Sequence, residues 1–167
     1  MTRDEGPVRL AGWGETSDAH HMSAPDPTGR GARSAMELAL KRAGVQPEQV
    51  DYINLHGTGT HHNDVMEVLA VSELCGTSVP VSSTKPLTGH TLGAAGAIEA
   101  AFAYMTLTDN PSGTLPPHWW DGQADPSLSR VEIVAPSYHL GRAPAYVLSN
   151  SFAFGGSNAS LLLGAGG

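Results

Sequence analysis

The sequence predicts an α/β fold in which helices are layered against a mixed β-sheet. Short apolar runs rich in β-branched residues, such as Val50–Leu55, have the pattern of buried strands. Between such runs lie longer segments with an apolar stripe at helical spacing, such as Gly31–Ala43. Strands that alternate with helices along the chain indicate a layered α/β architecture.

Composition and length favour one globular domain, expected to span residues 1–167. The chain has 40% apolar and 15% charged residues, which suits a protein with much buried surface. Its 20 glycines and 12 prolines allow many turns without reaching a low-complexity composition. No apolar run is long enough to span a membrane, and the charged N-terminus lacks the apolar core of an export signal.

The single cysteine and the net charge indicate the compartment of the protein and the classes of partner that it can bind. One cysteine excludes an internal disulfide and suits a reducing compartment, so we expect a cytoplasmic protein. That residue, Cys75, ends a predicted helix, where the helix dipole disfavours a thiolate, and we interpret it as an inert structural thiol. A net charge of −7 argues against nucleic-acid binding, which needs a basic face.

The first third of the chain is predicted to form a strand, a polar loop, a helix and a second strand. Val8–Trp13 has a strand pattern, and the loop Gly14–Arg30 follows it. The helix Gly31–Ala43 turns its apolar stripe toward the core and stops at Gly44. The strand Val50–Leu55 comes next.

Two helices and one strand are predicted in the middle of the chain. A helix from about Val65 to Leu74 would be capped by Asn63 or Asp64, whose side chains can accept from free backbone N–H groups. Val79–Ser82 has a strand pattern. The helix Gly93–Thr108 is rich in alanine, whose small side chain allows close packing, so we expect it to be buried near the middle of the domain.

The last third is expected to supply three strands after a long loop. The loop Asn110–Pro126 contains the adjacent residues Trp119 and Trp120, which are unusual in an exposed loop and are expected to pack at an interface. A turn over residues 150–158 is predicted to join the last two of the strands, which are Val131–Val134, Ala145–Leu148 and Ala159–Leu163.

Two loops stand out because each places one histidine in a turn just after an apolar run. His56 begins the segment HGTGT, His90 ends the segment SSTKPLTGH, and Lys85 falls between them. The glycine beside each histidine lets the backbone turn sharply or come close to a ligand. Two such histidines, near Thr, Gly and a Lys, favour a polar catalytic pocket.

Four motifs in a fixed order carry a resemblance to a known family. HGTGT, SSTKPLTGH, GAAGAIEA and NSFAFGGSN resemble segments of the C-terminal half of β-ketoacyl synthases, the condensing enzymes of fatty acid and polyketide assembly. The resemblance runs from about Val8 to Leu163. It implies one half of a thiolase-like fold, with a five-stranded mixed sheet layered with helices. Such enzymes are normally more than twice this long, and the half that carries their nucleophilic cysteine is absent from this chain.

The resemblance implies roles for both histidines, Lys85 and Glu99. His56 and His90 match the family's active-site histidines, which assist decarboxylation of malonyl on an acyl carrier protein and stabilise the enolate. Neutral imidazoles can donate to an enolate oxygen through Nε2–H. The alternative is that both are solvent histidines in polar loops. Lys85 matches the family's lysine and Glu99 its partner, and the pair is expected to hold the His90 loop in shape.

The resemblance also implies a path for the phosphopantetheine arm. Thr58 and Thr60 would hydrogen-bond its amides, or else act as turn residues that satisfy local backbone groups. Ser23 lies on a loop that resembles the family's entrance, and a solvated loop is the alternative. Phe154 matches the gating phenylalanine, whose backbone N–H lines the thioester oxyanion hole, and its flanking glycines would let the loop swing. Core packing is the alternative role for Phe154.

A metal site competes for some of the same residues. Nitrogen and oxygen ligands could come from His56, His61, His62, Asp64 and His90. Their spacing matches no closed metal motif, and two adjacent histidines would point in different directions. We therefore expect no metal and no cofactor, apart from the phosphopantetheine arm of acyl carrier protein, which carries the substrates.

The resemblance implies partners as well. An N-terminal-half polypeptide would supply the cysteine, and a dimer of such heterodimers is expected from the family's dimers. Acyl carrier proteins are acidic and need a basic docking surface, which is expected mainly on the other half. The best basic set in this chain is Arg30, Arg33, Lys41 and Arg42. The rival interpretation is an inactive ketosynthase-like remnant that acts as a binding or scaffold module.

Overall fold

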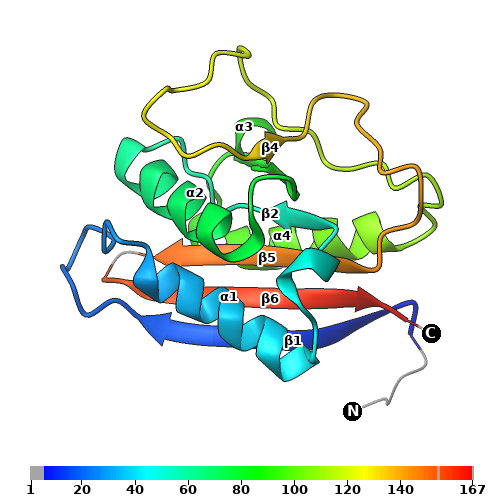
Figure 1. Ribbon diagram of the computed structural model, residues 1–167, viewed down its shortest axis with the longest axis horizontal. Helices are drawn as coiled ribbons and strands as arrows, with labels where there is room; N and C mark the ends of the chain where they lie inside the picture. The colour runs from blue at the N-terminus through cyan, green and yellow to red at the C-terminus, as the bar shows by residue number, and fades with distance from the viewer. Residues whose placement is uncertain (1–5, 154, 167) are drawn as a thin grey trace.

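The computed structural model describes residues 6–153 and 155–166, and a single mixed sheet forms the centre of this part (Figure 1). Its strands are β1 (Val8–Ser17), β2 (Tyr52–Asn54), β3 (Pro80–Ser82), β4 (Glu132–Ile133), β5 (Tyr146–Ala153) and β6 (Ser157–Ala165). They lie in the order β1-β6-β5-β2-β3-β4. β6 runs antiparallel to both β1 and β5, whereas β5, β2, β3 and β4 are mutually parallel, which confirms the predicted mixed sheet.

The sheet has six strands within the described residues, where the resemblance predicted five. The residue patterns themselves indicate six strands, and the first of them, β1, lies at one edge and pairs with β6 from Val8–Ala165 to Ser17–Ser157. β1 also continues past its predicted end at Trp13. The first part of the predicted polar loop is therefore strand, because the antiparallel ladder with β6 satisfies its backbone groups.

Helices cover both faces of the sheet (Figure 1). α1 (Arg30–Ala43) and α2 (His61–Cys75) pack on one face, and α4 (Ala95–Leu107) packs on the other. α1 approaches β1 so closely that a Cβ at Gly14 would lie 1.8 Å from the Ala35 carbonyl oxygen, so only glycine fits there. The sheet therefore separates two hydrophobic cores. One contains Met36 and Ile53, and the other contains Tyr52 and Val147.

The start of α2 differs from the prediction. The helix begins at His61, after Thr60 in an extended conformation, and neither Asn63 nor Asp64 caps it. Asn63 is buried inside the first turn, where its side chain donates to Glu67 (3.4 Å). Because this turn contains no apolar residue, the hydrophobic pattern placed the start of the helix too late.

α4 is buried on one side only, which corrects the prediction that it lies buried near the middle of the domain. Ala103 and Leu107 pack against the sheet. Tyr104 and Met105 are exposed on the opposite side. Because nearly every residue of α4 is apolar or small, its sequence carries no period that could show which face is covered.

β5 and β6 form a tighter hairpin than predicted. β5 continues to Ala153 and β6 begins at Ser157, and these two residues pair. Within the segment predicted as a turn, Asn150 is buried and accepts a hydrogen bond from Ser160 Oγ (2.8 Å). Asn and Ser usually signal turns, so the pattern ended the strand too early.

Short helical segments complete the fold. They are η1 (Pro47–Gln49), α3 (Lys85–Thr88) and η2 (Leu92–Ala94), and the last two flank His90. Across the described residues, none of the helices combines the length and the apolar character that a bilayer-spanning segment requires.

Candidate active site

The loop that carries His56 follows β2 and is fixed by a buried carboxylate from α2. Glu67 Oε1 accepts the backbone N–H of His56 (2.7 Å), and Oε2 accepts that of Gly57 (2.8 Å). Burial raises the pKa of Glu67 to about 7, although these two hydrogen bonds oppose the shift. A side chain on the helix thereby sets the position of the first histidine loop.

The rings of His56 and His90 lie close together. Their centroids are 5.5 Å apart and the rings are nearly perpendicular, at 82°. His90 Nδ1 accepts the backbone N–H of Leu92 (3.2 Å), so the neutral ring carries its proton on Nε2. Burial, together with the positive charge of Lys85, lowers the pKa of His56 to about 3, so His56 is neutral at physiological pH.

Lys85 is a buried cation that joins two parts of the site. Its Nζ donates to the carbonyl oxygen of His56 and to Glu99 Oε1. Burial raises the pKa of Glu99, and the hydrogen bond from Lys85 opposes this shift. The ammonium thus contacts the His56 loop directly, and its pairing with Glu99 ties the segment that leads to His90 to α4. α3, which begins at Lys85, leads on toward His90.

Ser83 links the two loops a second time. Its Oγ donates to the carbonyl oxygen of Gly57 (2.7 Å) and accepts the backbone N–H of Lys85 (3.3 Å). The side chain of Ser83 therefore connects the start of α3, where Lys85 lies, to the loop that carries His56.

The two threonines lie together in the HGTGT loop. Thr58 Oγ1 and Thr60 Oγ1 are 2.9 Å apart, and Thr60 is exposed, so both hydroxyls can reach a ligand from solvent. Ser23 is also exposed, and its amide and hydroxyl face His21 Nδ1 at 3.2 and 3.4 Å. Within the described residues, Ser23 is not brought into contact with the two central histidines.

The Ser23 loop is nevertheless tied to the β5–β6 hairpin. The backbone N–H of Asp18 donates to the Gly156 carbonyl (2.8 Å), and Asn158 Nδ2 donates to Asp18 Oδ1 (2.7 Å). Phe154, the predicted gate, lies outside the described residues. Among the described residues, Phe152 lies beside His56; it is buried, and its ring centroid is 6.1 Å from that of His56.

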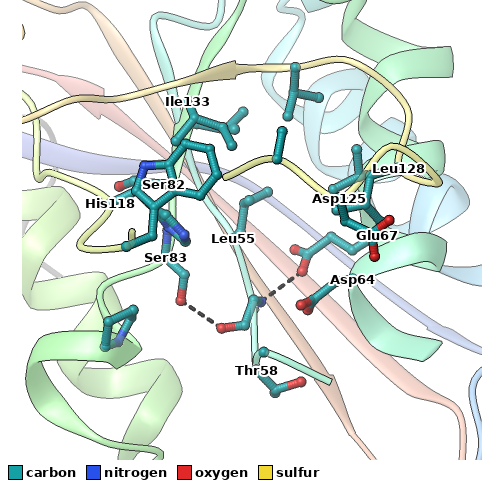
Figure 2. A pocket seen from close by; sticks show the side chains of 18 of the residues that line it. Leu55, Thr58, Asp64, Glu67, Ser82, Ser83, His118, Asp125, Leu128 and Ile133 are labelled. Atoms are coloured by element: carbon teal, nitrogen blue, oxygen red, sulfur yellow. Dashed lines mark hydrogen bonds between the residues drawn. The ribbon is translucent and has the colours of Figure 1, made fainter. Parts of the chain in front are cut away.

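A cavity of about 890 Å³ opens beside these loops (Figure 2). Its walls come from α2, from the ends of β2 and β3, and from the long loop between α4 and β4. The labelled side chains combine apolar surface with carboxylates and one imidazole, and they include Leu55, Thr58, Asp64, Glu67, His118, Leu128 and Ile133. Lys85 and His90 line the cavity as well, which makes it continuous with the two histidine loops.

The cluster of possible metal ligands does not form. Among the residues that the structure describes, no three His, Cys, Asp or Glu side chains come close enough together to hold a metal ion. His61 instead lies 3.9 Å from Asp125, between Nδ1 and Oδ2. Cys75 packs partly buried against the core, and burial raises its pKa to about 12, which agrees with an inert thiol.

Comparison with known proteins identifies the family. Residues 8–119 match the family described as β-ketoacyl synthase, C-terminal domain. The chain belongs to the β-ketoacyl synthase family. The 3-oxoacyl-[acyl-carrier-protein] synthase 2 of Rhizobium meliloti is 44% identical over 159 residues, which make up 93% of this chain and 36% of that protein.

Solved ketosynthase structures confirm the thiolase-like fold. A ketosynthase in complex with its chain length factor, from Xenorhabdus doucetiae, matches with a TM-score of 0.90 and 47% identity, over 98% of this chain and 40% of that one. A type II polyketide synthase acyl-carrier protein in complex with its ketosynthase, bound to a hexaketide, matches with a TM-score of 0.84, at 27% identity over 95% of this chain and 38% of that one. This ketosynthase domain thus spans between 36% and 40% of the length of these relatives.

Two residues that organise the ketosynthase site were missed from the sequence. Glu67 has the usual appearance of a solvated helix residue, although it shares a helical face with Asn63 and with the buried residues Ala70 and Val71. That spacing is a usable signal for burial. Ser83 gave no such signal, because its role depends on the approach of two loops that are far apart in sequence.

Proposed function

We propose that this domain carries out decarboxylation and enolate stabilisation in a β-ketoacyl-acyl carrier protein synthase, which condenses an acyl thioester with malonyl on acyl carrier protein. The observation that carries the proposal is the pair of rings at His56 and His90, whose centroids are 5.5 Å apart. Two imidazoles at this separation can both donate to one developing oxyanion. Lys85 supports them by binding the His56 carbonyl.

The proposed chemistry is balanced without an oxidant or a reductant. The bond between the malonyl methylene and its carboxylate breaks, CO₂ leaves, and the electron pair passes into an enolate whose negative charge lies on the thioester oxygen. Nε2–H groups of His56 and His90 would stabilise that charge. The enolate carbon then attacks the carbonyl of an acyl group held on cysteine, and the cysteine thiolate leaves.

The nucleophilic cysteine is proposed to come from an N-terminal half, carried by a partner polypeptide. Large apolar side chains are exposed on the consecutive segments α3, η2 and α4, namely Leu87 (57%), Leu92 (73%), Tyr104 (43%) and Met105 (66%). Exposed apolar surface of this kind is typical of an interaction site. Its position on both sides of His90 favours a partner that completes the active site.

Substrate delivery is proposed to follow the loops already described. Thr58 and Thr60 would bind the pantetheine amides, Ser23 would lie at the entrance, and Phe154 would act as the gate. Acyl carrier protein would dock mainly on the partner half, and two heterodimers would associate in the cytoplasm. The match to a ketosynthase with its chain length factor supports a heteromeric assembly.

Native mass spectrometry of the gently purified protein tests the assembly. A partner that contains a cysteine-bearing N-terminal half should travel with this chain, and its mass would identify it. A well-behaved monomer with an ordinary monomer surface would contradict the assembly and favour the binding-module interpretation.

Malonyl decarboxylation by the assembled complex tests the chemistry. His90→Ala should lower the rate roughly 100-fold, as expected for loss of one oxyanion donor, with the complex intact. His139→Ala is the matched control, because His139 is exposed on the segment between β4 and β5. Equal rates for wild type and His90→Ala would exclude the proposed role.

A further inference from the structure

His118 lies on the loop between α4 and β4, at the point where this loop runs beside the end of β3. Three hydrogen bonds hold this loop against β3 and the residues around it. Ser82 Oγ donates to the Pro116 carbonyl (2.6 Å), and the His118 backbone N–H donates to the Val134 carbonyl (2.9 Å). The third bond uses the imidazole of His118: the backbone N–H of Ser83 donates to His118 Nδ1 (3.1 Å).

The imidazole of His118 therefore contacts the residue that connects the two catalytic loops. Ser83 is almost fully buried, at 1% exposure, so its backbone N–H has little access to water if His118 is replaced. Figure 2 shows His118 and Ser83 on the same side of the cavity, with hydrogen bonds continuing from Ser83 through the His56 loop to Glu67. A disturbance at His118 would reach that loop through a single residue.

We propose that His118 is a positioning residue whose Nδ1 holds Ser83 and thereby fixes the His56 loop relative to Lys85. It acts through Ser83 and does not touch the reacting groups. The expected effect on catalysis rests on the proposed function, whereas the effect on the loops does not.

The geometry demands one tautomer of His118. Because Nδ1 accepts a hydrogen bond, it carries no proton, and the neutral ring is protonated on Nε2. Long-range ¹H–¹⁵N spectra of the wild-type chain should therefore show an unprotonated Nδ1 at pH 7. A protonated Nδ1 would overturn the proposal without any mutation, so this measurement does not depend on a variant that folds.

Two substitutions separate the acceptor from the bulk of the ring. His118→Asn keeps an acceptor oxygen close to the position of Nδ1, whereas His118→Leu keeps volume but accepts nothing. In His118→Leu, hydrogen exchange at the Ser83 amide should accelerate at least about tenfold, and the Gly57 and Lys85 amide resonances should shift. His118→Asn should stay close to wild type, and His139→Leu, the same change at an exposed site, should move none of these signals.

The same variants connect positioning to catalysis in the assembled complex. His118→Leu should lower kcat for malonyl decarboxylation about tenfold while KM changes less than about twofold, and His118→Asn should restore most of the rate. Unchanged hydrogen exchange at the Ser83 amide in His118→Leu would overturn the proposal. Shifted Gly57 and Lys85 amide resonances together with an unchanged kcat would also overturn it. If the wild-type complex had no decarboxylase activity but the amides responded as expected, the proposed function would fail while the positioning of the loops by His118 stood.

Discussion

Glu67 accepts the backbone N–H of His56 at 2.7 Å, so a buried carboxylate on α2 fixes the backbone at His56. The same carboxylate accepts the N–H of Gly57 through its other oxygen. Two backbone donors thus depend on one side chain, which is itself only 1% exposed.

Glu67→Ala should therefore destabilise the domain. Leaving two buried donors unpaired should reduce the free energy of unfolding by about 3 kcal/mol, measured by chemical denaturation. Glu73→Ala on the same helix is the control, because Glu73 pairs with Arg33 at the surface and its loss should cost less than about 1 kcal/mol. Equal effects of the two substitutions would contradict the assigned role of Glu67.

The buried pair of Lys85 and Glu99 should show strong coupling. Lys85→Met removes the cation and leaves a buried carboxylate unpaired, which should cost about 3 kcal/mol of stability. Glu99→Gln in the same background should recover part of that loss, because the remaining group is neutral. A double-mutant cycle measures the coupling. Additive effects would show that the two side chains do not depend on each other.

The stability of the domain should depend on pH through His56. Its pKa is about 3 in the folded protein, because of burial and the nearby charge of Lys85, and about 6.5 in the unfolded chain. As the pH falls below 6.5, the unfolded state binds a proton that the folded state does not bind, so stability is lost. Between pH 6.5 and 4.5 this loss should amount to about 2–3 kcal/mol.

His56→Asn isolates this contribution. The variant cannot bind the proton in either state, so relative to wild type its free energy of unfolding should rise by about 2–3 kcal/mol between pH 6.5 and 4.5. The titration of Glu67, whose raised pKa acts in the opposite direction, occurs in both proteins and cancels from the comparison. Parallel pH profiles for wild type and variant would show that His56 is not held neutral by the fold.

The sequence predicted most of the sheet and helices because their apolar periodicity is strong, as in α1. It failed where polar residues are buried. Asn150 looked like a turn signal yet lies inside β5, where Ser160 satisfies it. Glu67 likewise looked solvated, because a charged helix residue is expected at the surface. A local pattern cannot show that a polar group will find a partner from another element.

The candidate site was predictable in its residues but not in its connections. The motifs named His56, His90, Lys85 and Glu99, and the structure brings these four together. That Lys85 binds the carbonyl of His56 depends on how two loops meet at the ends of neighbouring strands. Such contacts follow from tertiary structure, which spacing along the chain does not encode.

The exposed side of α4 gives a last prediction. Met105 is 66% exposed, so Met105→Glu should change the free energy of unfolding of the isolated chain by less than about 0.5 kcal/mol. In the proposed assembly the same residue becomes buried against the N-terminal half, where an unpaired carboxylate is costly. The affinity of the Met105→Glu chain for the partner should therefore fall at least about tenfold, measured by titration calorimetry. Leu10→Glu, at an exposed apolar residue on β1, is the matched control and should leave binding unchanged. Unaltered binding by Met105→Glu would place the partner on a different face and remove α4 from the interface.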